Sequence, residues 1–239
     1  MRTVLVTGAS GAIGRATALA FLQEGDRVGL GCFRRAGETQ AFCAQARAQG
    51  LNAQCLPFDA RDPAACRAAV QALGRVDVLV HNAGLPHIAL LQDTTDQAWR
   101  QLFALHVDAA FYLTKACLPH MLDRQAGCIV LVGSMWGQVG ASMETAYSAA
   151  KAALIGYAKA LAKELGPSGI RVNCVCPGLI DTPMNASLAP EALADICEET
   201  PLGRMGTPEE VAQAIRFLAS PQAGFITGQV LGVNGGLVV

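Results

Sequence analysis

The chain lacks several features that mark other classes of protein. Its net charge is only -1 at pH 7, so the charge balance does not indicate binding to nucleic acid or to an anionic membrane. No basic start and long apolar run, as in a secretory signal, precedes the first strand-like segment. The uncharged segment 217–239 is broken by Pro221 and several glycines, which argues against a membrane span. We therefore expect a cytoplasmic protein without nucleic-acid or membrane partners.

Cysteine is plentiful, but its spacing excludes most cysteine chemistry. The nine cysteines include no Cys-x-x-Cys pair and no zinc-ligand spacing, so we expect no metal site. Such a scattered set is typical of reduced thiols in the cytosol. Cys174 and Cys176 alternate along one expected strand and face the same side, where a reduced thiol packs as a small apolar group.

Strand-like and helical segments alternate along the whole chain, and apolar residues make up 52% of it. Strands are expected at 3–6, 27–31, 54–58, 76–80, 127–132, 170–176 and 229–233. Helices are expected at 15–24, 36–50, 96–118, 146–165 and 208–219, with a polar irregular stretch at 181–206. This alternation predicts an α/β fold, a seven-stranded parallel sheet with helices on both faces. No repeat or linker divides the chain, so we expect a single domain over residues 1–239.

A glycine-rich turn follows the first expected strand. Segment 7–14 reads Thr-Gly-Ala-Ser-Gly-Ala-Ile-Gly and leads into a helix. Glycine lets the backbone approach a pyrophosphate, and the helix N-terminus supplies free N–H groups and partial positive charge. An ordinary tight turn is the alternative, but the flanking strand and helix favour a dinucleotide site in a Rossmann fold.

The second expected strand ends without the acidic residue that would accept the ribose hydroxyls of NAD(H). Arg34 and Arg35 follow it instead. Because a guanidinium matches a phosphate group, we predict NADP(H) as the cofactor. The alternative is that one or both arginines are solvated loop charges.

Ser134, Tyr147 and Lys151 form the candidate catalytic group. Ser134 follows a buried strand, and Tyr147 and Lys151 lie four residues apart, on one face of a helix. A neighbouring cation lowers the pKa of a phenol, so Tyr147 is expected to protonate a carbonyl oxygen that Ser134 holds. A Tyr-x-x-x-Lys pair on a helix surface would have the same spacing, so the pair alone is a weak signal.

These motifs, in this order, resemble the single-domain type of the short-chain dehydrogenase/reductase family over nearly the whole chain. The resemblance rests on the glycine turn, Asn82-Ala83-Gly84, the candidate catalytic group, Pro177-Gly178 and the closing Asn234-Gly235-Gly236. It implies that Tyr147 is the general acid, that Lys151 lowers its pKa and binds the nicotinamide ribose, and that Ser134 orients the carbonyl. The implied cofactor residues are Gly8, Ser10, Ile13, Gly14, Asp59, Asn82, Ala83, Gly84, Pro177, Gly178 and Thr182. The resemblance also implies a homotetramer and a substrate lid at 181–206.

Two positions depart from the family pattern. Ala12 stands where the family usually has glycine, although Gly11 precedes it. His106 aligns with the family's catalytic asparagine, which helps place a water that relays protons to the lysine. Histidine also donates and accepts hydrogen bonds, so we expect the relay to survive. His81 has no partner visible in the sequence, and we expect it to be structural.

Within the family, the segments 160–177 and 201–206 resemble bacterial 3-oxoacyl-acyl-carrier-protein reductases. Segment 134–142 is similar to a subgroup that reduces the 5-aminopentanone modification on elongation factor P, with Trp136 and Gln138 shaping the substrate pocket. Simple packing is the alternative for Trp136. The substrate stays open among small-molecule and carrier-bound ketones: acyl thioesters, a modified protein side chain, and steroids or small diketones. A non-catalytic dinucleotide-binding regulator is the alternative of another class, although such proteins usually lose the tyrosine or the lysine.

Overall fold

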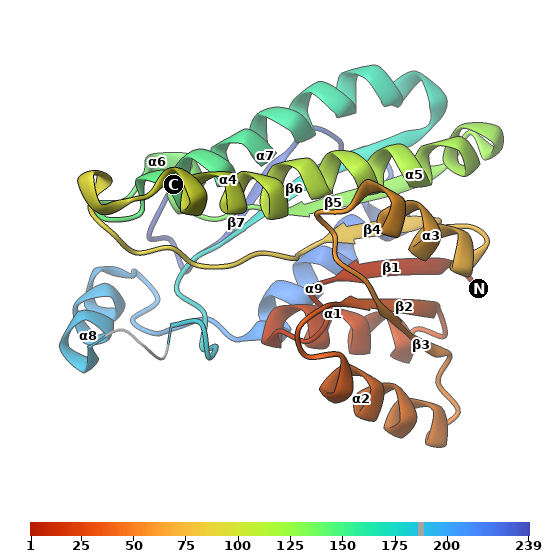
Figure 1. Ribbon diagram of the computed structural model, residues 1–239, viewed down its shortest axis with the longest axis horizontal. Coiled ribbons are helices and arrows are strands. Elements are labelled where there is room, and N and C mark those ends of the chain that lie inside the picture. The colour runs from red at the N-terminus through yellow and green to blue at the C-terminus, as the bar shows by residue number, and fades with distance from the viewer. Residues whose placement is uncertain (186–188) are drawn as a thin grey trace.

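A seven-stranded parallel sheet runs through the computed structural model, which describes residues 1–185 and 189–239 (Figure 1). Its strand order is β3-β2-β1-β4-β5-β6-β7. The strands are β1 (Thr3–Thr7), β2 (Arg27–Cys32), β3 (Ala53–Pro57), β4 (Val78–His81), β5 (Gly127–Val132), β6 (Ile170–Pro177) and β7 (Val230–Val233). The expected fold class is confirmed, and the strand boundaries lie close to those expected.

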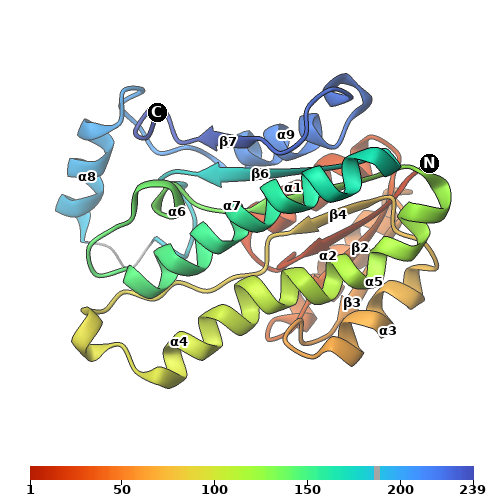
Figure 2. The same cartoon turned by 90° about the horizontal axis from the view of Figure 1, so that it is seen from above.

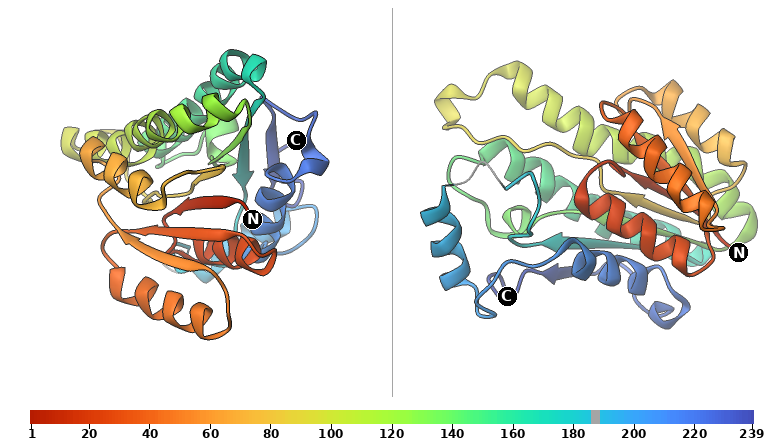
Figure 3. Two further views of the ribbon diagram at one scale, coloured as in Figure 1. Left: turned by 90° about the vertical axis from the view of Figure 1, so that its right-hand side faces the viewer. Right: turned by 90° about the horizontal axis from the view of Figure 1, so that it is seen from below.

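Helices cover both faces of this sheet (Figures 2 and 3). The helices are α1 (Ala12–Gln23), α2 (Ala36–Ala48), α3 (Pro63–Leu73), α4 (Asp96–Phe103), α5 (Ala109–Arg124), α6 (Trp136–Val139), α7 (Thr145–Leu165), α8 (Pro190–Glu199) and α9 (Pro208–Leu218). Short 3₁₀ turns lie at Leu91–Asp93, Gly166–Ser168 and Pro221–Ala223. Helices α3, α5 and α7 pack on one face, and α1, α2 and α9 pack on the other.

Successive side chains of each strand supply the two cores. In β1, Leu5 packs with α3, α5 and α7, whereas Val4 and Val6 pack with α1, α2 and α9. In β6, Cys174 and Cys176 lie in the first of these cores, as expected for reduced thiols. Because both faces are buried, the strands read as continuous apolar runs rather than as an alternation of apolar and polar residues.

The strand order reverses next to β1, and this is where the glycine turn lies. The Asn82 side-chain amide, just after β4, donates to the Thr7 carbonyl (3.2 Å) and the Gly8 carbonyl (3.3 Å). A Cβ on Gly14 would collide with the Gly8 carbonyl, so this position requires glycine. Open α/β sheets bind ligands at such a switch point, at the carboxyl ends of the strands.

The expected helix 96–118 is wrong in two respects. It is interrupted by a π-helical turn, η2 (Ala104–Asp108), between α4 and α5, and it continues through Pro119 to Arg124. Cys117 and Met121 are fully buried against the sheet, and this packing holds the turn around Pro119 despite the missing N–H group.

The stretch 181–206 is not entirely irregular, because it contains α8. The half-buried Leu193, Ile196 and Cys197 are spaced at helical intervals, and acidic residues fill the exposed face between them. Residues 186–188 of the expected lid lie outside the described residues. The role of 181–206 as a substrate lid stays a prediction.

Candidate active site

A pocket of about 180 Å³ opens at the carboxyl edge of the sheet, beyond β4, β5 and β6. The four predicted catalytic residues all line it. Ser134 follows β5, Tyr147 and Lys151 lie one turn apart on α7, and His106 comes from η2. Residues 4 to 45 positions apart in sequence thus meet in one cavity, as the sequence predicted.

Lys151 is a buried cation at the base of this pocket. Its Nζ donates a hydrogen bond to the Val132 carbonyl at 2.8 Å and lies 5.5 Å from the centroid of the Tyr147 ring. Burial lowers the pKa of Lys151 to about 8. The side chain is therefore still mostly an ammonium at neutral pH.

Tyr147 differs from the sequence-based expectation. Burial raises its pKa to about 12, and the nearby Glu144 and Cys176 add to this, although the Ser134 side chain acts in the opposite direction. The expected lowering of this pKa by Lys151 is wrong for the protein alone, because burial outweighs the other influences. Tyr147 thus keeps its proton at neutral pH, which is the form that a general acid needs.

Ser134 is fixed by the backbone that surrounds it. The Gly133 N–H bonds the Val175 carbonyl (2.7 Å) and the Met135 N–H bonds the Pro177 carbonyl (3.0 Å), so the ladder with β6 extends past β5. The Ser134 Oγ accepts a hydrogen bond from the Trp136 N–H (3.2 Å), and its hydroxyl also acts on Tyr147, whose pKa it lowers.

Of the two predicted substrate residues next to Ser134, one lines the pocket and the other does not. Trp136 begins α6 and lines the pocket. Gln138 is exposed and is not among the residues that line it.

His81 connects the glycine turn to the π-helical turn. The Thr7 Oγ1 accepts hydrogen bonds from the Asn82 and Ala83 N–H groups (both 3.1 Å), so its proton is free to bond His81 Nδ1 at 3.2 Å. This assigns the ring proton of His81 to Nε2, which donates to the His106 carbonyl at 3.0 Å. Burial lowers the pKa of His81 to about 4, so the ring stays neutral. The structure gives His81 the partners that were not visible in the sequence.

His106 is fully buried and packs edge-on against Tyr147, with ring centroids 5.6 Å apart. Its Nε2 lies 3.1 Å from the Leu85 carbonyl oxygen and 3.2 Å from the Leu85 nitrogen. In either tautomer, Nδ1 is a buried polar atom without a hydrogen-bond partner among the described residues. Burial and the nearby Lys151 ammonium hold the pKa of His106 well below its usual value. Position 106 therefore carries a neutral ring with one unused nitrogen.

The remaining predicted cofactor residues line cavities that continue from this pocket toward β2 and β3. One cavity, of about 210 Å³, is lined by Gly8, Ser10, Arg34, Arg35, Asp59, Ala83 and Gly84. A second is lined by Gly8, Ser10, Ile13, Arg35, Asn82, Gly84 and Thr182. Pro177 and Gly178 line the Tyr147 pocket, whereas Gly14 lines none of the three and packs on Gly8. Gly84 borders all three cavities, so they form one track along the carboxyl edge.

The far end of this track is basic. Arg34 and Arg35 are exposed, and Arg35 lies 3.7 Å from Glu38. A third guanidinium, Arg61, was not foreseen: it binds the Asp59 carboxylate at 2.6 Å and lowers the pKa of that carboxyl. Asp59, one of the expected cofactor residues, thus has a cationic partner two residues along the chain. Three guanidinium groups, those of Arg34, Arg35 and Arg61, thus lie at this end of the track.

Glu144 also lines the Tyr147 pocket, although no motif in the sequence pointed to it. Its only sequence signal is an acidic residue three positions before the tyrosine, which is common on helices.

In the part of the chain that the structure describes, His, Cys, Asp and Glu form no cluster of three or more that would hold a metal ion. None of the helices described combines the length and apolar character needed to cross a bilayer.

Comparisons with known proteins agree with this geometry. A family model described as enoyl-(acyl carrier protein) reductase matches residues 8–238. The chain is 40% identical over 244 residues to a 3-oxoacyl-acyl-carrier-protein reductase of Thermotoga maritima, covering 100% of this chain and 98% of that protein. It is 39% identical over 238 residues to an uncharacterized oxidoreductase of Bacillus subtilis, covering 98% of each chain.

A solved structure shares the fold across the whole chain. The crystal structure of a 3-oxoacyl-acyl-carrier-protein reductase from Brucella melitensis with bound NAD superposes with a TM-score of 0.93 at 34% identity, covering 100% of this chain and 91% of that one. The chain therefore belongs to the short-chain dehydrogenase/reductase family, whose members bind NAD(P). It is an oxidoreductase of that family, and the expectation of an enzyme rather than a regulator is confirmed.

Proposed function

We propose that the protein is an NADPH-dependent ketone reductase that resembles 3-oxoacyl-thioester reductases and uses Tyr147 as its general acid. The observation that carries this proposal is the convergence of Ser134, Tyr147 and Lys151 in one pocket, at the end of the track that fits a dinucleotide. The whole-length similarity to reductases of 3-oxoacyl groups supports the choice of substrate class.

In the proposed mechanism, each of these three side chains acts on the carbonyl oxygen or on the proton that it receives. NADPH, when bound, supplies the hydride to the carbonyl carbon. Ser134 Oγ donates a hydrogen bond to the carbonyl oxygen, and Tyr147 Oη transfers its proton there as negative charge develops. The Lys151 ammonium stabilises the phenolate that remains on Tyr147. The high pKa of Tyr147 in the protein alone suits reduction, because the tyrosine begins the reaction protonated.

The preference for NADPH rests on the basic end of the track. Arg34 and Arg35 line the cavity beside β2, and no acidic residue follows that strand to accept a ribose diol. Both guanidinium groups are exposed, so they are accessible to a 2′-phosphate.

We also propose that His106 retains the proton relay to Lys151. The unused Nδ1 is buried in a pocket-lining ring, and the ring stays neutral, so it is able to hold a water molecule beside the lysine. After Tyr147 has released its proton, Lys151 would pass one to the phenolate, and such a water would then supply the proton that Lys151 has lost.

Other substrates remain alternatives. The sequence likeness around Ser134 favours the 5-aminopentanone modification on elongation factor P, and Trp136 lines the pocket as that alternative requires. Gln138, the other residue of that likeness, is exposed outside the pocket. A hydroxysteroid or another small ketone would also use the Ser134, Tyr147 and Lys151 geometry.

We further propose a homotetramer in the cytoplasm, with 181–206 as its substrate lid. Large apolar side chains remain exposed on α4 and α5, namely Trp99, Phe111 and Leu122, and Leu231 is exposed on the edge strand β7. Faces of this kind are candidates for contacts between subunits. The mass of the protein in solution, measured by light scattering, tests this assembly.

The direct test of function is NADPH oxidation by the purified protein with an acetoacetyl thioester, with NADH as the paired cofactor. We expect turnover with NADPH, a much weaker reaction with NADH, and a loss of about 10³-fold in kcat/KM for Tyr147→Phe. The Tyr147→Phe variant should still bind NADPH. Wild type that binds NADPH but reduces neither this thioester nor any ketone of a broad panel would contradict the proposal.

A further inference from the structure

Segment 82–90, which follows β4 without forming a helix or strand, supplies part of the wall of the Tyr147 pocket. It contributes Pro86 and Ile88 to the lining. Ser134 and Lys151 are buried deep in the pocket, whereas Ile88 is 48% exposed. Ile88 therefore lies at the mouth, where an apolar side chain stays in contact with water until a ligand covers it.

One main-chain hydrogen bond holds the outer part of this segment. The Ala89 N–H donates to the Met143 carbonyl at 2.7 Å. Residues 86–89 are all described by the structure, and they make no other hydrogen bond between main-chain groups. Because Ile88 directly precedes Ala89, its position at the mouth depends on where the Met143 carbonyl lies.

Met143 presents this carbonyl from an unfavourable backbone conformation. It is the third residue of a turn that the Glu144 N–H closes on the Ala141 carbonyl at 3.3 Å, and its φ is +64°. Glycine or asparagine usually occupies such a position, because a larger side chain crowds the backbone there. The other non-glycine residue described with a positive φ, Gln125, ends a helix, where this conformation is common. Met143 ends no helix, so its strained conformation indicates a role in the pocket.

The turn that contains Met143 is attached to α7 beside the catalytic tyrosine. The Ala141 N–H donates to Ser148 Oγ at 3.2 Å, and Ser148 directly follows Tyr147. The Met143 carbonyl thus has a fixed place relative to Tyr147. Through the bond to Ala89, the same holds for the apolar wall at the mouth.

We propose that Ile88 is a specificity-determining residue that binds the alkyl chain of the ketone, and that Met143 is the residue that positions it. This inference rests on the proposed ketone reduction at Tyr147 and assigns the preference of that site for chain length. The pocket, of about 180 Å³, is smaller than most ligand sites, so a chain of several carbons reaches the mouth.

At the mouth, the chain would cover the exposed face of Ile88. Apolar contact of this kind favours binding by about fourfold for each methylene group. The arm of a thioester carries amide groups, so the apolar wall of Pro86 and Ile88 suits the alkyl chain on the other side of the ketone.

The test compares two thioesters that differ in chain length. The N-acetylcysteamine thioesters of acetoacetic acid and 3-oxohexanoic acid are assayed with NADPH, because the second has two more methylene groups beyond its ketone. Ile88→Ala removes the apolar face. Met143→Val places a β-branched residue in the left-handed turn, which should displace Ala89 without changing any side chain of the pocket.

Two further variants are the matched controls. Met143→Gly keeps the turn, because glycine adopts a positive φ without strain. Leu90→Ala shortens a side chain that is exposed on the same segment and does not line the pocket.

For wild type we expect kcat/KM to be about tenfold higher for the longer thioester. This ratio should fall about tenfold in Ile88→Ala and in Met143→Val. The loss should appear in KM rather than in kcat, because the chain is bound alike in the ground state and the transition state. The ratio should keep its wild-type value in Met143→Gly and Leu90→Ala. An unchanged ratio in Ile88→Ala or Met143→Val, or a wild-type ratio near one, would overturn the inference.

A binding measurement keeps the inference testable if the proposed function fails. Should wild type reduce neither thioester, the 3-oxohexanoyl thioester is titrated into the enzyme with NADPH and the nicotinamide fluorescence is followed. A Kd about tenfold weaker in Ile88→Ala than in Leu90→Ala would support binding of the chain by Ile88. Equal Kd values, or no binding to wild type, would overturn it.

Discussion

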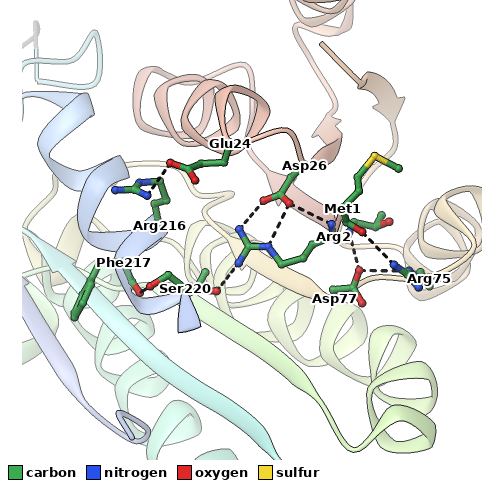
Figure 4. A network of polar contacts seen from close by, with 11 residues as sticks. Met1, Arg2, Glu24, Asp26, Arg75, Asp77, Arg216, Phe217 and Ser220 are labelled. Atoms are coloured by element: carbon green, nitrogen blue, oxygen red, sulfur yellow. Dashed lines mark hydrogen bonds and ion pairs between the residues drawn. The ribbon is translucent and has the colours of Figure 1, made fainter. Parts of the chain in front are cut away.

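The two edges of the sheet differ in how completely their polar groups are paired. At the amino edge, the charged side chains are paired with one another (Figure 4). Arg2 binds the buried Asp26 carboxylate at 2.6 Å and the Ala219 carbonyl at 2.7 Å. Asp77 accepts from the Thr3 N–H at 2.7 Å and pairs with two arginines. At the carboxyl edge, by contrast, Glu144 is unpaired and His106 Nδ1 has no partner among the described residues.

This difference separates charges that hold the chain together from charges that are available to a ligand. A buried polar group without a partner costs free energy, so it is retained where something other than folding uses it. The amino edge contributes to stability, because its ion pairs join the starts of β1, β2 and β4. Substitutions at the two edges should therefore affect different properties, and four predictions test this.

Among the tests of this comparison, the largest effect is expected from removing the basic end of the cofactor track. An Arg34→Ser/Arg35→Ser variant should lose about 100-fold in kcat/KM for NADPH, because two charge-assisted contacts to phosphate are removed. Its kcat/KM for NADH should change less than about threefold. Steady-state kinetics with both cofactors measures this, with the exposed Arg67→Ser as the control. A double variant that still prefers NADPH would show that the two arginines are solvated loop charges.

A smaller effect is expected from pH. Lys151 has a pKa lowered to about 8 by burial, so it is charged below that pH and loses its charge above it. The ammonium stabilises the Tyr147 phenolate, so kcat/KM for ketone reduction should fall as pH rises through 8, by about tenfold per pH unit at the steepest. Rates measured from pH 6 to 10 give the profile, and a flat profile would contradict this role for Lys151.

The same profile tests His106. Because the ring is neutral throughout this range, His106→Asn should keep the alkaline decline and change turnover less than tenfold. A rise of more than tenfold in turnover, with NADPH affinity unchanged, would mean that the histidine impairs the relay.

The smallest effect on catalysis is expected at the amino edge. Asp26→Asn removes the charge that pairs with Arg2 and should lower the free energy of unfolding by about 2 kcal/mol. Its kcat/KM should equal that of wild type, because the change lies at the opposite end of the strands. Denaturant unfolding and the standard assay test the two parts. A loss of activity at unchanged stability would contradict the assignment of the amino edge to stability rather than to catalysis.

Most of the fold was predictable because it depends on local sequence. Continuous apolar runs mark the strands, and glycines such as Gly14 are required by close backbone contacts that a motif records. Helix α8 was missed because its few apolar residues, such as Leu193 and Ile196, stand among acidic residues, so their helical spacing is a weak signal. The π-helical turn was missed because the contact that fixes it, from His81 to the His106 carbonyl, joins residues far apart in sequence.

The convergence of the candidate catalytic residues was predictable from the sequence, but the electrostatics of their pocket were not. Ser134, Tyr147 and Lys151 meet where their spacing indicated. The pKa of Tyr147 was predicted in the wrong direction, because a sequence shows a neighbouring lysine but not the depth of burial. Glu144 was overlooked for a similar reason, since only the folded pocket shows that its carboxylate lacks a partner.

The hydrogen bonds that run from Thr7 through His81 to the His106 carbonyl have a consequence for position 106 itself. His81 bonds the main-chain carbonyl of residue 106 rather than its side chain. A change of residue type there therefore leaves this hydrogen bond in place, although it removes the contacts of the buried ring with Tyr147 and Leu85. Histidine and asparagine differ at the first codon base alone. A single mutational step at position 106 thus changes the chemistry beside Tyr147 while the hydrogen bond between the two turns is kept.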